Sequence, residues 1–401
     1  DGKVRHASFQ GLREDKEPTE VRRERAAPPP DETPEEPKAV KGARRRSTAK
    51  AAASLPTATP SPTATTTPSP TGTTTPSPTS RSRPERSAAP ARPRGRKPTE
   101  VVGGVPITNP DRVMYPDPGY TKRDVARYYE AVADAIVPHV AGRPLTLYHC
   151  PEGLAGGCRF MKHSKVWAPD AVRRVAIREK AKIGEYLVVD DATALLSVVQ
   201  MDVLELHTWN STTDRLEEPD RIVLDLDPGP EVAFAEVVRA ARLVRDALAA
   251  LGLAAFAKTT GGAGLHVVVP LVPARPWQEC LAFARAFAAA IARHDPRRFT
   301  VAFARAGRER KILLDYLRNN RTNTSVAAFS ARARAGAPVS VPVSWDELGP
   351  RLRPERHTLR TVPRRLASLR EDPWRGYDAA RRPLDAARLA AVSALSAPPS
   401  G

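Results

Sequence analysis

The chain has 401 residues and carries a formal net charge of +18, with a pI near 10.2. A positive balance of this size is typical of a protein with a polyanionic partner, most often nucleic acid, although a solvated surface with arginine-rich tails has the same composition. No run of 18 apolar residues and no signal-peptide pattern is present, so we expect no membrane partner and a cytoplasmic protein. The three cysteines, Cys150, Cys158 and Cys280, predict no disulfide framework, as in a reducing compartment.

Residues 26–100 differ in composition from the rest of the chain. They are rich in Pro, Thr, Ser, Ala and Arg and include the run TATPSPTATTTPSPTGTTTPSPTS. Such a segment buries too little apolar surface to offset its chain entropy, which predicts a disordered linker. After it, we expect a compact domain over residues 101–370 and a tail over 371–401 with one weak helix.

The domain alternates between predicted helices and strands. Apolar residues at helical spacing follow a Thr121 cap in residues 120–140, and two longer helices are predicted over 234–252 and 277–295. Strands are predicted over 143–150, 185–190, 221–227 and 310–317, with a strand, glycine loop and second strand over 254–271. This alternation favours an α/β fold with mixed sheets and flanking helices.

Three carboxylates stand in apolar strands. Asp225 and Asp227 lie on the same face of RIVLDLDPGP, because side chains alternate along a strand, and Asp315 lies in KILLDYL. Like charges beside an apolar layer are costly unless a cation neutralises them. Separated acids on neighbouring strands suit two Mg²⁺ or Mn²⁺ ions that bind a triphosphate, although an ordinary strand end with acidic caps is the simpler interpretation.

The glycine loop in KTTGGAGLHVVVPL is a second candidate element. Gly261 and its neighbours let backbone N–H groups approach an anion, and His266 follows on the next strand. The loop matches neither a P-loop nor a dinucleotide fingerprint. His207 and Trp209 in LELHTW suit a base or sugar, with a core tryptophan as the equal alternative.

The run HCPEGLAGGCRFMKH admits a zinc site formed by His149, Cys150, Cys158 and His163, but its spacing matches no standard finger. Phe160 and Lys162 in the same run are better suited to contact a nucleic-acid strand.

In their order along the chain, these motifs resemble the polymerase domain of bacterial ligase D, a member of the archaeo-eukaryotic primase superfamily. The resemblance rests on NPDRVMYP, GYTKRDVARYYEAVA, GRPLTLYHCPEG, LELHTWNS, DRIVLDLDPGP, TTGGAGLHVVVPL and LDYLRNNR followed by FSARARAGAPVS. It implies a primase-like fold and nucleotidyl transfer to primers, with NTP or dNTP as substrate, in bacterial non-homologous end joining. It also implies DNA ends and Ku as partners, a monomeric domain and a location at the bacterial nucleoid.

The resemblance also assigns residues. The implied catalytic metal ligands are Asp225, Asp227 and Asp315. The implied nucleotide contacts are Lys122, His207, Thr260, His266, Arg308, Lys311 and Arg332, and the implied DNA contact is Arg112. The residue patterns described above add Gly261 to the expected nucleotide contacts and Phe160 and Lys162 to the expected DNA contacts. Two features depart from the family's pattern. Ala263 stands where a basic residue is usual, and the run NNRTNTSVAAFSARAR differs from the sequence that the family usually has at that place.

Residues 1–25 resemble the end of the ligase domain of the same family. GLREDK matches a ligase motif in which Arg13, Asp15 and Lys16 would contact ATP phosphates, but no KxDG lysine nucleophile is present. We therefore expect a longer protein in which a ligase domain precedes the linker. Other functions stay open: an inactive module that binds DNA ends, a metal-dependent nuclease or phosphoesterase, and a primase that starts chains without a primer.

Overall fold

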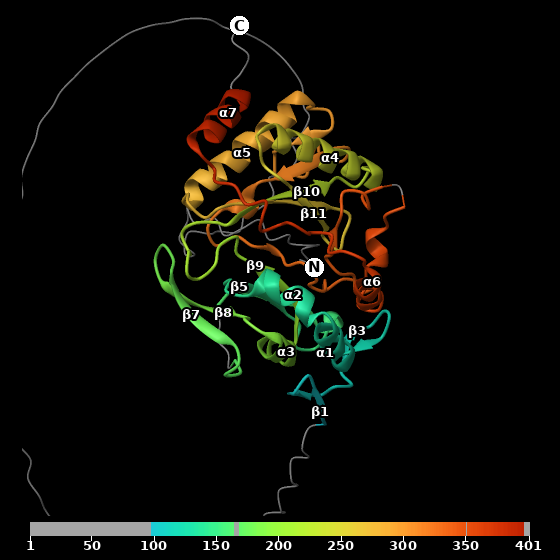
Figure 1. The fold of residues 1–401 in the computed structure, drawn as a ribbon. Helices are drawn as coiled ribbons and strands as arrows, with labels where there is room; N and C mark the ends of the chain where they lie inside the picture. The colour runs from blue at the N-terminus through green and yellow to red at the C-terminus, as the bar shows by residue number, and fades with distance from the viewer. Residues whose placement is uncertain (1–97, 164–167, 350, 397–401) are drawn as a thin grey trace, which may run out of the picture. The chain divides into compact units, whose positions relative to one another are not determined.

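The apolar run around Asp225 forms the central strand of a six-stranded sheet (Figure 1). The computed structural model describes residues 98–163, 168–349 and 351–396, so the predicted ligase remnant and nearly all of the linker lie outside the described residues. In order across the sheet, the strands are β13 (Phe299–Thr300), β14 (Ile312–Asp315), β10 (Arg221–Pro228), β12 (Leu265–Pro270), β11 (Phe256–Thr259) and β16 (Pro342–Val343). All pairs are antiparallel except β13 with β14, so the sheet is mixed, as predicted.

Helices cover one face of this sheet. Ile222, Leu224 and Leu226 of β10 belong to the main hydrophobic core together with residues of α4 (Phe234–Ala250) and α5 (Trp277–His294). The opposite face of β10 carries the two carboxylates, because side chains alternate along the strand. The helices thus leave the acidic face of the sheet free for other parts of the domain.

A second sheet is also six-stranded. Its order is β15 (Ser325–Val326), β9 (Val203–Thr208), β5 (Leu145–His149), β8 (Ile183–Val188) and β7 (Arg173–Arg178), and β6 (Arg159–Met161) also pairs with β5. Two hairpins lie outside both sheets: β1 (Thr99–Val102) with β2 (Val105–Thr108), and β3 (Val113–Tyr115) with β4 (Tyr120–Thr121). Short helical segments are η2 (Leu154–Gly156), η3 (Leu317–Asn319), η4 (Pro354–Arg356) and α6 (Val362–Ser368).

The helix predicted over residues 120–140 is two helices, α1 (Lys122–Ala131) and α2 (Ala133–Val140). The Thr121 cap is confirmed: its hydroxyl accepts from the Asp124 backbone N–H, and the Asp124 carboxylate accepts from the Thr121 N–H in return. Both helices and α3 (Ala192–Gln200) add buried residues to the core beside β9 and β5. None of the described helices is long and apolar enough to cross a membrane.

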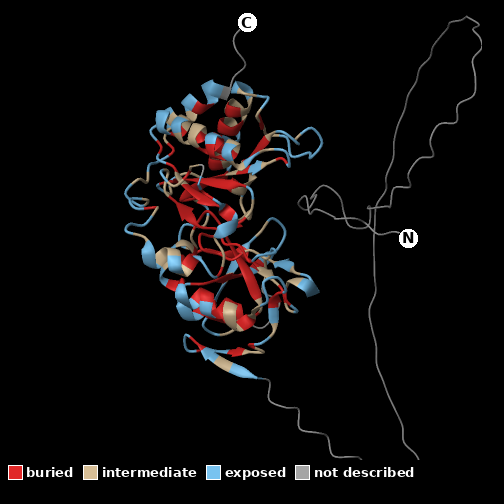
Figure 2. Ribbon diagram, turned by 90° about the vertical axis from the view of Figure 1, so that its right-hand side faces the viewer, coloured by how far each residue is buried: buried red, intermediate tan, exposed pale blue. Residues whose placement is uncertain are grey.

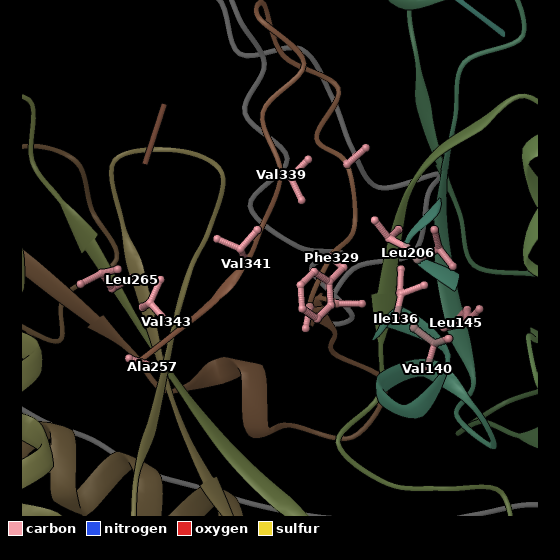
Figure 3. Close-up of a cluster of buried hydrophobic side chains, with 14 of the residues drawn as sticks. Ile136, Val140, Leu145, Leu206, Ala257, Leu265, Phe329, Val339, Val341 and Val343 are labelled. Atoms are coloured by element: carbon pink, nitrogen blue, oxygen red, sulfur yellow. The ribbon is translucent and has the colours of Figure 1, made fainter. Parts of the chain in front are cut away.

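Aliphatic side chains and one aromatic ring join the two sheets. In Figure 3, Phe329 lies between Val341 and Ala257 on one side and Ile136 and Leu206 on the other, and all five residues belong to one core. Figure 2 shows the buried residues concentrated in the strands, with exposed positions mostly on the outer helices and loops.

The segment after residue 370 packs on the domain. Trp374 is buried and its indole N–H donates to the Ala257 carbonyl oxygen of β11 at 2.7 Å. Farther along, α7 (Ala386–Ser396) contributes Val392 to the core next to α5. The single helix expected in this tail is therefore present, and the segment that leads to it completes the folded domain.

Candidate functional site

The acidic residues form a row across the central sheet. Asp225 of β10 is the register partner of Asp315 of β14 on one side and of His266 of β12 on the other. Lys258 of β11 is in turn the partner of His266. Directly opposed residues in an antiparallel pair point to the same face, so these four side chains and Asp227 line one surface.

Arginines neutralise the carboxylates, and His266 lies beside them. Arg318 reaches Asp315 at 2.9 Å through its Nη2 and Asp225 at 3.3 Å through its Nε. Arg308 bridges to Asp227 at 2.8 Å, and the His266 Nε2 lies 3.5 Å from an Asp225 oxygen. The two predicted ends of the acidic site, β10 and β14, are therefore brought together, and Arg318 links them.

The pKa values of the paired acids move in opposite directions. Burial opposes ionisation of Asp225, but His266 and the Arg318 guanidinium hold its pKa below the ordinary range. Burial raises the pKa of Asp315, and the charges of Asp225 and Asp227 add to this effect while Arg318 opposes it. This is the behaviour of carboxylates that repel one another at close range.

Among the residues that the structure describes, no three His, Cys, Asp or Glu side chains are grouped closely enough to hold a metal ion. Instead, the guanidinium groups of Arg318 and Arg308 pair with the acids. They relieve the repulsion between the carboxylates, as a bound metal ion would. The donor set itself fits a divalent ion of the Mg²⁺ or Mn²⁺ type, because it consists of carboxylate oxygens that face one another across adjacent strands.

The glycine loop joins β11 to β12 beside this row. The Thr260 hydroxyl donates to the Gly264 carbonyl oxygen at 3.1 Å and so closes the loop on itself. Gly261 has a φ of +67°, which favours glycine, and a Cβ at Gly264 would lie 2.6 Å from the Leu226 carbonyl oxygen. The loop can take this close path to β10 only with glycine at these positions.

Two arginines lie against the loop. A Cβ at Gly262 would lie 2.6 Å from Nη1 of Arg334, and one at Gly261 would lie 2.6 Å from Cγ of Arg332. Arg332 also donates through Nη1 to the Thr260 carbonyl oxygen. Burial lowers the pKa of Arg334, with the charge of Arg332 acting in the same direction, and Arg334 forms no ion pair with another described residue.

The second sheet faces this group through β9. Glu205 accepts hydrogen bonds from the His207 Nε2 at 2.7 Å and from the Arg332 Nε at 2.9 Å. Phe160 of β6, 58% exposed, meets the His207 ring edge to face at 5.4 Å and the Tyr148 ring at 4.6 Å. Lys162 follows β6. Burial opposes ionisation of Glu179, but hydrogen bonds from Tyr186 and His163 lower its pKa, and the charge of Lys162 acts in the same direction.

Lys122 and Arg112 form a separate group. The Lys122 Nζ lies 2.7 Å from one Asp202 oxygen, and the Arg112 Nη1 lies 2.9 Å from the other. Lys122 had been expected in the nucleotide site and Arg112 at the DNA, but the structure pairs the two cations on one carboxylate. Lys311 begins the turn into β14, where its carbonyl oxygen accepts from the Gly229 N–H at 2.8 Å.

The expectation of unpaired cysteines is wrong, because Cys150 and Cys158 form a disulfide. The pairing also removes both thiolates from the conceivable zinc site, and His163 is bound to Glu179 at 2.8 Å. Trp209 is fully buried against Tyr186 and Trp277, so it is a core residue and cannot stack on a base.

Two residues at this site, Arg334 and Glu205, were not selected from the sequence. Arg334 looked like an ordinary surface charge in an arginine-rich run. Glu205 carried a signal that could have found it, namely a carboxylate two residues before His207 on the same face of an apolar strand.

Known proteins with similar sequence or fold identify the chain's family. The model of the family described as "LigD, primase-polymerase domain" matches residues 121–374. The chain is 34% identical over 388 residues to the multifunctional non-homologous end joining protein LigD of Pseudomonas aeruginosa, covering 96% of this chain and 40% of the relative. It is 28% identical over 257 residues to the bifunctional LigD protein of Bacillus subtilis, covering 64% and 41% respectively.

A solved structure has the same fold. The polymerase domain of Mycobacterium tuberculosis ligase D, determined in complex with DNA, matches with a TM-score of 0.64 and 31% identity, covering 69% of this chain and 98% of that domain. The fold and the matched region therefore define a polymerase domain of the primase type. The chain belongs to the LigD primase-polymerase domain family, and it spans about 40% of the length of the Pseudomonas relative.

Proposed function

We propose that this chain is a metal-dependent nucleotidyltransferase that extends primers and fills gaps with NTP or dNTP during non-homologous end joining. The observation that carries the proposal is the register of Asp225 with Asp315, which opposes two carboxylates on adjacent strands beside a glycine loop and basic side chains. The names of the relatives, which are end-joining proteins, and the DNA in the matched Mycobacterium structure support it.

The metal site is the first part of the proposal. Asp225, Asp227 and Asp315 would hold two Mn²⁺ or Mg²⁺ ions, which would supply Lewis acidity toward a primer 3′-hydroxyl and toward the triphosphate. The 3′-hydroxyl gives up its proton to water, its oxygen bonds to the α-phosphorus as the bond to the bridging oxygen breaks, and pyrophosphate leaves. Arg318 and Arg308 compensate the negative charges of the carboxylates in the free protein and turn to phosphate oxygens in the loaded one.

The triphosphate cradle is the second part. Backbone N–H groups at Gly261 and Gly262, the Thr260 hydroxyl and the guanidinium groups of Arg332 and Arg334 converge on the loop. The family usually has a basic residue where this chain has Ala263. Arg334 supplies the positive charge toward phosphate in its place. His266 and Lys311 flank the cradle from β12 and from the start of β14.

Contacts to DNA are the third part. Phe160 is exposed and suits stacking on an unpaired base, with Lys162 near it. Arg112 binds a DNA phosphate through its exposed part, and the buried Lys122 supports it by neutralising Asp202 from within the domain. DNA ends, Ku and a ligase domain of the same protein are the proposed partners of a monomeric polymerase domain.

Primer extension tests the function. The full chain should lengthen a labelled primer on a gapped template with Mn²⁺ and NTP, and Asp225→Asn should stop it without weakening DNA binding. DNA binding with no extension by the wild type would identify an inactive end-binding module instead. Shortening of the primer would identify a nuclease, and products formed without any primer would identify a primase.

A further inference from the structure

Glu205 is a buried carboxylate whose hydrogen bonds all lead toward the proposed nucleotide site. It is 4% exposed in the middle of β9. One of its oxygens accepts from the His207 Nε2 at 2.7 Å and the Arg332 Nε at 2.9 Å, and the other accepts from the Ala333 backbone N–H at 2.7 Å. Burying an ionised carboxylate costs free energy unless hydrogen-bond donors replace the lost water. The three donors to Glu205 do so and keep it ionised.

The ionised state of Glu205 fixes the protonation of His207. Burial opposes the charge on Glu205, but the His207 hydrogen bond and the Arg332 charge lower its pKa to about 2, so the carboxylate only accepts hydrogen bonds. The His207 Nε2 must therefore carry a proton. Burial lowers the pKa of His207, which keeps its ring neutral near pH 7 and leaves Nδ1 as an acceptor.

Glu205 also sets the direction of Arg332. The guanidinium donates through Nε to Glu205 and through Nη1 to the Thr260 carbonyl oxygen, which ties β9 of one sheet to the glycine loop of the other. Two of its five N–H groups are used in this way, and the fork that remains is held beside Gly261.

We propose that Glu205 is the positioning residue of the nucleotide site and the source of its preference for ribonucleotides. It presents the bare Nδ1 of His207 to a ribose hydroxyl, which donates to it, and it aims Arg332 at a phosphate. A deoxyribonucleotide lacks one hydroxyl donor, so it leaves that acceptor unpaired and binds less well. The inference rests on the proposed function and deepens it.

A purely structural role for Glu205 is the alternative, because its bonds also fasten the segment around Ala333 to β9. Glu205→Gln removes the charge. A glutamine whose oxygen takes the place of Oε2 can still accept from the His207 Nε2 and the Arg332 Nε, but neither bond is charge-assisted any longer. Its amide nitrogen then opposes the Ala333 N–H, so the variant separates the two roles when it is compared with and without His207→Ala. Glu185→Gln on β8 is the matched control, since Glu185 is exposed and paired only with the surface residue Arg174.

The experiment measures single-nucleotide addition by the full chain, with ATP and dATP compared for each variant. Glu205→Gln should raise the KM for ATP at least about tenfold, the loss of one charge-assisted hydrogen bond, and reduce the ATP-to-dATP ratio of kcat/KM by a similar factor. In a His207→Ala background the same substitution should change that ratio less than twofold, because the two residues act as a unit. Glu185→Gln should match the wild type.

A ratio and a KM within twofold of the wild type in Glu205→Gln would overturn the inference, whatever happens to the melting temperature. A second readout does not need activity. Histidine ¹⁵N spectra of the wild type at pH 7, assigned with His207→Ala, should show His207 protonated at Nε2 only, and protonation at Nδ1 would contradict the inference. Failure of the wild type to extend any primer would count against the proposed function, while the spectra would still test Glu205.

Discussion

Asp315 shows at the scale of a single residue how the fold creates a charged site that the sequence only suggests. Its carboxylate opposes that of Asp225 across β14 and β10, and burial together with the nearby acids raises its pKa. A residue in this position is unfavourable for the free protein, which is typical of groups kept for function.

We predict that Asp315→Asn separates stability from activity. Primer extension should fall at least about 100-fold, because a lost metal ligand removes several kcal/mol of transition-state stabilisation. The melting temperature should stay the same or rise, since one of the repelling charges is gone. Asp246→Asn, at an exposed position of α4, is the control for both measurements. A loss of activity that simply follows a loss of folded protein would contradict the prediction.

Arg334 and Ala263 give a second prediction at this scale. Arg334→Ala should raise the KM for NTP about 10- to 100-fold, the value of one charge-assisted hydrogen bond to phosphate. Adding Ala263→Lys should recover most of the affinity, because a lysine in the loop itself would supply a second cation for the same phosphate. Kinetics of the single and double variants decide the matter: an unimproved double variant means that Arg334 does not replace a basic residue at position 263.

The sequence was informative for residues whose pattern is local. Asp225, Asp227 and His266 stand in strands next to a glycine turn, and the structure places them on one surface. The sequence was uninformative about pairings that depend on the path of the folded backbone. Lys122 meets Arg112 because both reach Asp202, and Cys150 meets Cys158 across a tight loop, which no periodicity encodes.

At the scale of secondary structure, the segment that ends in α7 shows the same limit. Propensity favoured a weak helix there, and the burial of Trp374 under the central sheet depends on contacts far along the chain. Strands and helices with strong apolar periodicity, such as β10 and α5, were foreseen, whereas short strands such as β15 and β16 were not.

We predict that this segment is required for stability. Trp374→Ala should lower the free energy of unfolding by about 3–5 kcal/mol, because a large buried ring and its hydrogen bond to Ala257 are lost. Removal of all residues after 370 should be at least as damaging. Urea denaturation measures both, with Arg375→Ala as an exposed control. Unfolding midpoints equal to the wild type would show that the tail is dispensable.

At the scale of the whole molecule, the partly buried His139 couples folding to pH. His139 lies between the rings of Phe329 and Trp374, at 6.0 and 5.3 Å, where the sheets meet. Burial lowers its pKa to about 3, and the charges of Arg221, Arg143 and Lys258 act in the same direction while Asp378 opposes them.

The sign of the effect follows from proton binding. Between the folded pKa of about 3 and an unfolded value of about 6.5, the unfolded chain binds the proton and the folded chain does not, so acid favours unfolding. We expect this residue alone to cost about 2 kcal/mol at pH 5 relative to pH 8. His139→Phe should flatten the pH dependence of the unfolding free energy over that range. An unchanged slope in the variant would exclude this histidine as its source.

The molecule as a whole places two sheets so that the acids of one and the Glu205 pair of the other share a site, with Arg332 as the bridge. The most direct test of this account is a crystal of the protein grown with Mn²⁺ and NTP, with anomalous scattering recorded for manganese. We predict anomalous peaks among Asp225, Asp227 and Asp315, with Arg318 turned away from the carboxylates. Bound NTP with no manganese at these residues, and Arg318 still bridging Asp225 and Asp315, would contradict it.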